Sequence, residues 1–281
     1  MNIASAINKA TNILKKRNIK TPLLDSEILM SQVIRKDIKY IVINADKDLS
    51  IEDLNLYENL INQRSYKKPL AYLSGTKGFW KNDFIVSKGT LIPRPDTELI
   101  IEQVLEITKN KSKLHILDLG VGSGCILLSI LKEKKHFYGT GVDISPICLK
   151  ISKMNATKLN LNTRSKFFKS DIDNFNFGKY DLIVSNPPYI KKLDLKYLEE
   201  DVIGFEPKLA LDGGLDGMSE IRKVVNKSSE LIKKNGKLIL EIAFDQKDEV
   251  KKILRCKGFY INNVVKDYGK NDRCIVSTKI K

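Results

Sequence analysis

Short apolar runs alternate with helical segments along most of this chain, starting at Leu114. The runs are rich in β-branched and aromatic residues, as buried strands are. They comprise Leu114–Leu119, Phe137–Asp143, Ser165–Lys169, Tyr180–Ser185 and Lys237–Ile242, with two late runs near Tyr260–Lys266 and Cys274–Ile280. Strands that alternate with helices favour a parallel sheet with helices on both faces. The sequence therefore predicts an α/β fold with a doubly wound, mostly parallel seven-stranded sheet.

The residues before this sheet predict a small helical bundle. Thr21 is expected to cap its second helix, with Pro22 in the first turn. Ser50-Ile51-Glu52-Asp53 resembles a capping box at the start of a further helix. The expected core positions are Ile3, Ile7, Ala10 and Leu14 in the first helix, and Leu24, Ile28 and Val33 in the second. Because the bundle carries no catalytic pattern, we expect it to be a recognition module.

A hairpin is predicted between Gly75 and Pro95, where glycine, aromatic and β-branched residues gather. It is expected to turn near Lys81-Asn82-Asp83 and to link the bundle to the sheet. We therefore expect three parts: the helical bundle in residues 1–74, the linking hairpin in residues 75–95, and an α/β domain in residues 96–281.

The composition favours a globular, cytoplasmic protein. Of the 281 residues, 42% are hydrophobic, and no apolar stretch approaches the roughly 20 residues that a membrane span needs. The amphipathic N-terminus lacks the apolar core of a signal peptide. Four scattered cysteines and two histidines argue against a zinc site or a disulfide framework. The net charge of +15 is carried mainly by lysine, and so it is weak evidence for a nucleic-acid partner.

A glycine-rich turn, Gly120-Val121-Gly122-Ser123-Gly124, joins the first predicted strand of the sheet to a helix. Glycines let the backbone approach a ligand, and the helix N-terminus offers free N–H groups. The loop resembles the S-adenosylmethionine loop of class I methyltransferases. Asp143 ends the next strand, where a carboxylate can accept hydrogen bonds from ribose hydroxyls; its alternative role is a helix N-cap. Asp171 follows the third strand, where it could contact the adenine amino group.

A stiff loop, Asn186-Pro187-Pro188-Tyr189, follows the strand that ends at Ser185. Open α/β sheets bind ligands at the carboxyl ends of their strands. Asn186 and the Pro187 carbonyl could accept the two hydrogens of a planar NH2 group while Tyr189 stacks on its plane. The alternative is a tight proline turn without a catalytic role.

This loop resembles that of enzymes that methylate adenine N6, guanine N2 or the glutamine side-chain amide. Further motifs make the whole chain similar to the peptide chain release factor glutamine methyltransferases. They are Pro69–Gly75, Phe79-Trp80, Leu91–Glu98, Phe205-Glu206-Pro207, Ala210-Leu211, Gly213-Gly214, Asp216-Gly217 and Asp267-Tyr268-Gly269 with Asp272-Arg273. The resemblance implies the class I methyltransferase fold, S-adenosylmethionine as cofactor, and class I release factors as protein substrates, methylated at the glutamine of Gly-Gly-Gln.

The resemblance also implies site residues. It assigns catalysis to Asn186, Pro187 and Tyr189, and substrate binding to these three with Pro188. It assigns cofactor binding to Gly120, Val121, Gly122, Ser123, Gly124, Asp143, Asp171, Ile172 and Asn186, with no metal. Two positions depart from the family: Ala243 replaces a usual glycine after Glu-Ile, and Ile172 replaces a residue that can be aromatic.

Other interpretations stay open at this point. Relatives of this family methylate ribosomal protein L3, and the shared loop also suits an adenine-N6 or guanine-N2 nucleic-acid methyltransferase. A non-catalytic RNA- or ribosome-binding module with this fold is a third possibility. Arg94 and Glu98 belong either to a lid over the cofactor or to a proline-bracketed linker. No arginine-rich or aromatic nucleic-acid platform is evident, so we expect no direct nucleic-acid substrate and no membrane.

Overall fold

The computed structural model describes residues 1–280, which form two compact units. The helical unit comprises Met1–Thr76 together with Glu199–Phe205, and the sheet unit comprises Lys77–Leu198 and the chain from Glu206 onward. None of the helices in residues 1–280 is both long and apolar enough to cross a membrane.

The helical unit has one apolar core, which residues 3–73 supply. Its helices are α1 (Ile3–Lys16), α2 (Pro22–Ile34), α3 (Ile38–Ile43), α4 (Ile51–Ser65), α5 (Leu70–Ser74) and, from later in the chain, α9 (Glu200–Phe205). The four core positions predicted in α1 are all buried. Ser50 caps α4 by accepting the Asp53 N–H at 3.0 Å, as the capping box predicts.

Thr21 and Pro22 occupy the predicted positions at the start of α2, as N-cap residue and in the first turn, but the capping bond and one core residue differ from prediction. The Thr21 hydroxyl does not accept a backbone N–H; it donates to Asp25 Oδ1 at 2.7 Å. Leu24 is not a core residue, because 47% of it is exposed. Leu29 and Met30 are fully buried instead. Asp25 faces inward because its other oxygen accepts a hydrogen bond from Arg64 at 2.7 Å, and this buried ion pair sets the rotation of the helix.

The predicted hairpin is present but turns earlier than expected. Strand β1 (Thr76–Phe79) pairs with β2 (Asn82–Ile85), so the turn is Trp80-Lys81, and Asn82 and Asp83 belong to a strand. Trp80 has a φ of +54°, which an aromatic residue rarely adopts. Its backbone N–H donates to Glu98 Oε1 at 2.6 Å and its indole N–H to Glu133 Oε1 at 2.8 Å. These contacts stabilise a turn that local preference alone would not predict.

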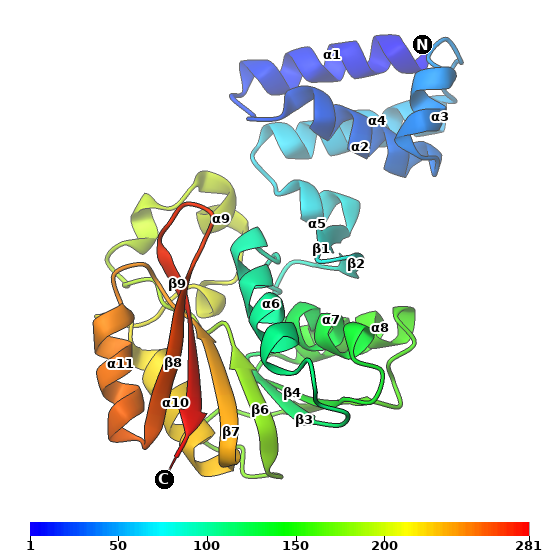
Figure 1. The fold of residues 1–281 in the computed structure, drawn as a ribbon. Helices are drawn as coiled ribbons and strands as arrows, with labels where there is room; N and C mark the ends of the chain where they lie inside the picture. The colour runs from blue at the N-terminus through cyan, green and yellow to red at the C-terminus, as the bar shows by residue number, and fades with distance from the viewer. Residues whose placement is uncertain (281) are drawn as a thin grey trace. The chain divides into compact units, whose positions relative to one another are not determined.

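The main sheet has seven strands in the order β5-β4-β3-β6-β7-β9-β8 (Figure 1). All neighbouring pairs are parallel except β7–β9 and β8–β9. The bounds are β3 (His115–Leu119), β4 (Tyr138–Asp143), β5 (Ser165–Lys169), β6 (Tyr180–Ser185), β7 (Ile232–Glu241), β8 (Phe259–Lys266) and β9 (Asp272–Lys279). The predicted fold is therefore confirmed, although β7 begins five residues before the predicted strand at Lys237.

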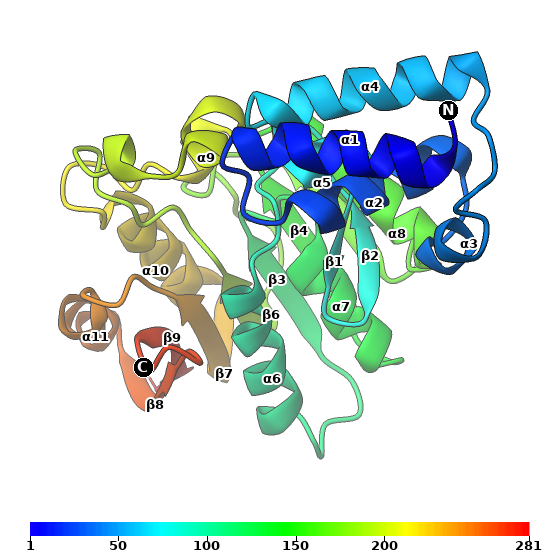
Figure 2. The ribbon, with the colours of Figure 1, turned by 90° about the horizontal axis from the view of Figure 1, so that it is seen from above.

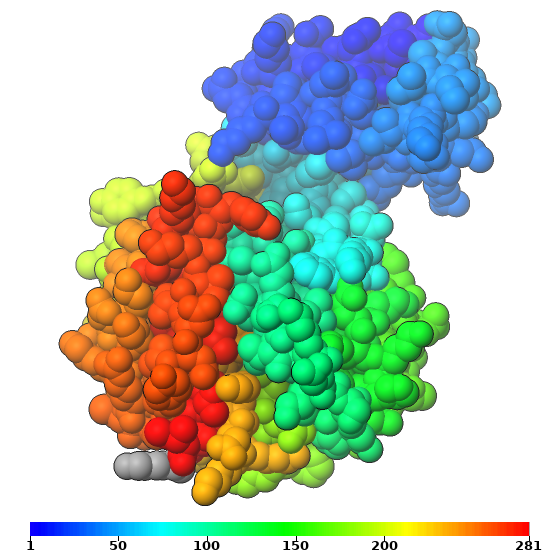
Figure 3. Space-filling view, in the orientation of Figure 1, coloured from blue at the N-terminus to red at the C-terminus, as the bar shows by residue number. Residues whose placement is uncertain are grey.

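Helices cover both faces of this sheet (Figure 2). Neighbouring residues of β3 enter different cores, one on each face of the sheet. Ile116 packs with a first group of helices and Leu117 packs with a second group. The first group is α6 (Glu98–Ile107), α7 (Cys125–Glu133) and α8 (Pro146–Lys158); the second is α10 (Ser219–Leu231) and α11 (Lys247–Cys256). Short 3-10 turns occur at η1 (Pro95–Thr97), η2 (Leu195–Tyr197) and η3 (Lys208–Ala210). In the space-filling view, α6 lies beside the C-terminal strands (Figure 3).

Candidate active site

Strand register places two loops side by side at the carboxyl edge of the sheet. Asp118 of β3 pairs with Val184 of β6, and the Ser185 hydroxyl donates to the Leu119 carbonyl at 2.6 Å. From β3 the chain continues to β4 and β5 on one side of this pair, and from β6 it continues to β7 on the other side. The β3–β6 pair is therefore the topological switch point of the sheet. The glycine loop and the Asn186 loop therefore begin next to each other.

The glycine loop has left-handed backbone at each of its glycines. Gly120 and Gly122 have φ of +81° and +54°, and a Cβ at either position would meet nothing within 4 Å. Gly124, with φ of +82°, differs because a Cβ there would lie 2.9 Å from Leu128 Cδ1. The first two glycines thus border open space in front of the N-terminus of α7, and the third permits close packing of that helix.

Asp143 closes this loop from the end of β4. Its Oδ2 accepts the Gly122 N–H and its Oδ1 accepts the Ser145 N–H, both at 2.9 Å. Burial raises the pKa of the carboxyl, and these backbone N–H donors oppose the rise. Asp143 is not the N-cap of α8, because Ser145 has that role and accepts the Cys148 N–H at 3.3 Å. Each Asp143 oxygen keeps a lone pair for a ligand hydroxyl.

The other predicted cofactor residues lie around the same edge. Val121 and Ser123 are buried, so their side chains support the loop from within. The Val121 N–H also donates to the Val142 carbonyl at 3.0 Å. Asp171 follows β5 and uses Oδ1 to accept the Asp173 N–H at 2.9 Å. Ile172 is half-buried against the core on the α10 side of the sheet. This edge of the sheet combines an open glycine loop, the Asp143 carboxylate and an apolar wall at Ile172. Such a combination fits a nucleoside cofactor.

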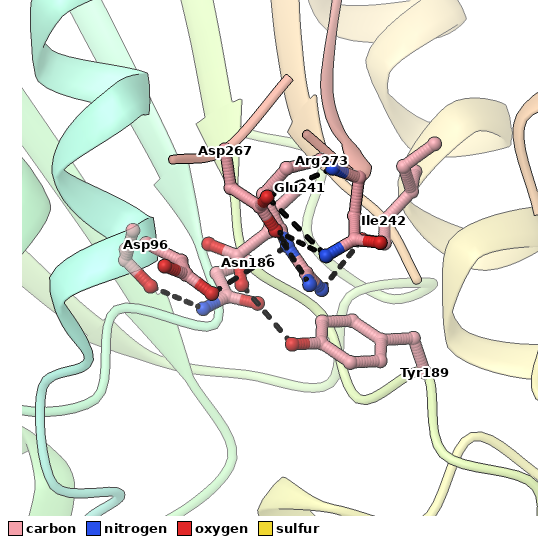
Figure 4. Close-up of polar contacts among 9 residues, drawn as sticks. Asp96, Asn186, Tyr189, Glu241, Ile242, Asp267 and Arg273 are labelled. Carbon is pink, nitrogen blue, oxygen red and sulfur yellow. Dashed lines mark hydrogen bonds and ion pairs between the residues drawn. The ribbon is translucent and has the colours of Figure 1, made fainter. Parts of the chain in front are cut away.

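The Asn186 loop is held by two side-chain hydrogen bonds (Figure 4). Asn186 Nδ2 donates to the Thr97 hydroxyl at 3.0 Å, which leaves Oδ1 available as an acceptor. The Tyr189 hydroxyl donates to Glu241 Oε1 at 3.2 Å. Pro187 is buried between these anchors. Burial and the nearby charges of Glu241 and Asp96 raise the pKa of Tyr189 against the opposing effect of Arg273, so its hydroxyl stays protonated and donates.

A charged network lies behind these two side chains. Arg273 contacts Asp267 at 3.0 Å and Asp96 at 3.7 Å, and its guanidinium donates to the Ile242 carbonyl at 3.3 Å (Figure 4). Glu241 is 1% exposed. Burial raises the pKa of Glu241 to about 7, against the opposing effects of Thr97, Arg273 and Tyr189. Its Oε2 accepts no hydrogen bond of good geometry from the described residues.

Arg94 and Glu98 both have partners inside the sheet unit. Arg94 forms an ion pair with Glu206, whose second oxygen accepts the Ile92 N–H at 3.1 Å. Glu98 accepts the backbone N–H of Trp80. These contacts favour the linker interpretation, in which the two residues tie the segment before α6 to its surroundings.

Three residues of this site have no role assigned from the sequence: Thr97, Glu241 and Arg273. All three lie in or beside segments that resemble the family, namely Leu91–Glu98, the Glu-Ile before Ala243, and Asp272-Arg273. The signal was present in those motifs. What it lacked was the tertiary contacts: the pairing of β6, β7 and β9, which brings Glu241 and Arg273 together, and the hydrogen bond that joins Thr97 to Asn186.

Comparison with known proteins agrees with this geometry. Residues 5–75 match the PrmC N-terminal domain family and residues 95–206 the Methyltransferase small domain family. A release factor glutamine methyltransferase of Clostridium acetobutylicum is 37% identical over 99% of both chains. One of Buchnera aphidicola is 38% identical over 99% of this chain and all of its own. This chain belongs to the release factor glutamine methyltransferase family.

The family confirms the resemblance predicted from the motifs, and with it the class of S-adenosylmethionine-dependent methyltransferases. A solved methyltransferase structure from Pyrococcus furiosus supports the fold, with a TM-score of 0.55 over 80% of this chain and 100% of its own at 17% identity. The assignment of individual residues to cofactor and substrate stays a prediction.

Proposed function

We propose that this chain transfers a methyl group from S-adenosylmethionine to the side-chain amide nitrogen (N5) of the glutamine in the Gly-Gly-Gln motif of class I release factors. The full-length relatives named for release factor glutamine methylation support this substrate. The observation that carries the proposal is the orientation of Asn186, whose Nδ2 is engaged by Thr97 so that Oδ1 is left to accept.

The substrate amide binds through its two hydrogens. Asn186 Oδ1 accepts one and the Pro187 carbonyl accepts the other, while the ring of Tyr189 packs on the amide plane and excludes water. Pro188 stiffens the loop, since proline restricts the backbone of both itself and the residue before it. The hydrogen bond from Tyr189 to Glu241 holds the ring in place.

The loop favours the transition state over the bound substrate. An amide nitrogen is a weak nucleophile because its lone pair is delocalised into the carbonyl group. As that lone pair localises, positive charge builds on the nitrogen, and the two acceptors bind its hydrogens more strongly. Alignment of the nitrogen lowers the barrier further, by as much as about 7–11 kcal/mol in favourable intramolecular cases.

The glycine loop and its neighbours hold the cofactor. Gly120, Gly122 and Gly124 shape the cradle, which Val121 and Ser123 support from within. The Asp143 carboxylate accepts from the ribose, and Asp171 and Ile172 contact the adenine. S-adenosylmethionine, when bound, supplies an electrophilic methyl group on its sulfonium.

The helical residues 1–74 recognise the release factor in this proposal, residues 75–95 link the parts, and residues 96–281 carry catalysis. A protein partner suits a bundle that carries no catalytic pattern.

Labelled methyl transfer from S-adenosylmethionine tests this function. The substrate is a purified class I release factor, and the control is its Gly-Gly-Asn variant. We expect label on the wild-type factor and none on the variant. Label on ribosomal protein L3 or on bare RNA or DNA, with none on the release factor, would overturn the proposal in favour of those substrates.

A further inference from the structure

We propose that Glu241 is a positioning residue, which orients Asn186 and Tyr189 for the substrate amide through the hydroxyls of Thr97 and Tyr189. This inference rests on the proposed amide-binding role of Asn186. It gives a role to Glu241, the last residue of β7, and to Thr97 in η1, neither of which the amide loop itself explains.

Strand register places the carboxylate where it can act. Ser185 of β6 pairs with Leu240 of β7, so the next residues along these parallel strands, Asn186 and Glu241, lie at the same level of the sheet. Glu241 also pairs with Cys274 of the neighbouring β9. The three strands therefore deliver Asn186, Glu241 and Arg273 to one edge.

Hydrogen-bond direction links the residues into a chain. Asn186 Nδ2 donates to the Thr97 hydroxyl, which must then direct its own hydrogen to another acceptor. Glu241 lies close enough to that hydroxyl for it to lower the pKa of the carboxyl, although Oε2 accepts no hydrogen bond of good geometry from the described residues. In the proposed arrangement the Thr97 hydrogen turns toward this carboxylate, so that the Thr97 oxygen presents a lone pair to Asn186 and Oδ1 faces away from Thr97. The Tyr189 hydroxyl donates to the same carboxylate at 3.2 Å.

Burial makes this arrangement sensitive to the charge of Glu241. A carboxylate can accept from both hydroxyls, but a protonated carboxyl has lost part of that capacity and becomes a donor itself. Thr97 is 3% exposed and Glu241 is 1% exposed, so water does not readily replace a lost partner. The charged and titratable groups that face Glu241 are Tyr189 after β6, Asp96 in η1, Arg273 and Cys274 in β9, and Cys125 in α7.

Variants of Thr97 test the link through its hydroxyl. Thr97→Val keeps the shape but removes the acceptor for Asn186, and Thr97→Ser keeps the hydroxyl. Thr108→Val is the matched control, because Thr108 is also buried and its hydroxyl bonds only within α6 and its cap, to the Val104 carbonyl. We expect kcat to fall about 100-fold in Thr97→Val, as for a misplaced catalytic group, to recover in Thr97→Ser, and to stay near wild type in Thr108→Val. Equal effects of the two valine variants would overturn the proposal.

The pH profile of Glu241→Gln tests the charge. Because burial raises the pKa of Glu241 to about 7, the wild-type kcat should rise as pH increases through that value and the carboxylate forms. The glutamine variant should have a low kcat and lack this rise, while its affinity for S-adenosylmethionine stays within about twofold. A glutamine variant that keeps both the wild-type kcat and its pH dependence would contradict a positioning role.

A readout without substrate separates this inference from the proposed function. The side-chain NH2 signals of Asn186 in a 15N-labelled protein, assigned by their absence in Asn186→Ser, report its hydrogen bond to Thr97. We expect their protection from hydrogen exchange to fall at least about 10-fold in Thr97→Val and to return in Thr97→Ser. Unchanged protection in Thr97→Val would overturn the positioning of Asn186, whichever substrate is methylated. Absence of label on the wild-type release factor would overturn only the proposed function.

Discussion

Asn186 is oriented by the protein itself, and this orientation suits the amide-binding role proposed for it. An amide has a donor end and an acceptor end of nearly equal size, and only its hydrogen bonds determine which end faces the substrate. Here Nδ2 is used within the protein, at 3.0 Å from the Thr97 hydroxyl. The acceptor end is therefore the one available to an incoming NH2 group, such as that of a glutamine side chain.

Replacing Asn186 by alanine should reduce kcat by about 100- to 1,000-fold, as removal of one transition-state hydrogen-bond partner does in other enzymes. Cofactor affinity, measured by calorimetry, should change little, because the glycine loop and Asp143 remain. Asn262→Ala on the exposed face of β8 is the control and should keep wild-type activity. Wild-type kcat in Asn186→Ala would refute the role assigned to this amide.

Gly122 is a second position where the proposed function depends on one residue. Its φ of +54° disfavours any side chain, although space for a Cβ exists. Gly122→Ala should cost about 1–2 kcal/mol in the loop conformation, and this would weaken S-adenosylmethionine binding about tenfold. Gly204→Ala, in helix α9 where φ is not positive and a Cβ also meets nothing within 4 Å, should leave binding unchanged. Calorimetric titration of both variants checks the difference; equal affinities would be inconsistent with a strained cradle.

At the scale of elements, the hairpin is joined to the glycine loop through helix α8. Asn155 of α8 accepts the Ile85 N–H at 2.7 Å and donates to the Ile85 carbonyl at 3.0 Å. The same Nδ2 donates to the Ser123 carbonyl at 2.8 Å. Asn155 is fully buried, so one buried side chain satisfies three backbone groups of the hairpin and the glycine loop.

Asn155→Leu should therefore destabilise the sheet unit by about 3 kcal/mol, since each buried backbone group left without a partner costs about 1–3 kcal/mol. Urea unfolding followed by the fluorescence of Trp80, the only tryptophan of the chain, measures this effect because Trp80 lies in the sheet unit. The exposed Asn162→Ala should unfold like wild type. A loss below about 0.5 kcal/mol in Asn155→Leu would mean that other donors replace the amide.

At the scale of the whole molecule, two buried carboxyl groups couple stability to pH. Burial raises the pKa of Asp118 to about 8, partly offset by the Leu127 backbone N–H, and burial likewise raises the pKa of Glu241 to about 7. Both groups titrate near pH 4 in an unfolded chain. Between pH 4 and 8 the folded protein thus binds more protons at these groups than the unfolded chain does, and their contribution to stability falls as pH rises.

We expect the free energy of unfolding of the sheet unit, followed by Trp80 fluorescence, to decrease between pH 5 and pH 8. Asp118→Asn should flatten this dependence, most clearly between pH 7 and 8, where Glu241 has already lost its proton. Asp46→Asn, at an exposed position, should retain the wild-type slope. A slope that is identical in all three proteins would show that Asp118 is ionised throughout.

Local features of this protein follow from the sequence alone. The strands that end at Leu119, Asp143, Lys169 and Ser185 agree with prediction at those ends, because short apolar runs stopped by glycine, aspartate or proline carry a strong local signal. The same local signal places the glycine loop, Asp143 and the Asn186 loop at the carboxyl ends of predicted strands. Their meeting at one edge also followed, since parallel strands share a carboxyl edge.

Tertiary structure alone decided which side chains stand behind that edge. Thr97, Glu241 and Arg273 come from three distant segments. The register of β6, β7 and β9 brings Glu241 and Arg273 to Asn186 and Tyr189, and Thr97 reaches Asn186 from η1 through a hydrogen bond. The exposure of Leu24 and the turn at Trp80 were likewise decided by long-range partners, the first by the buried Asp25–Arg64 pair. Local conformational preferences are worth fractions of a kcal/mol per residue. A buried charge left without its partner costs several kcal/mol of stability. The long-range pairing therefore decides the conformation where the two conflict.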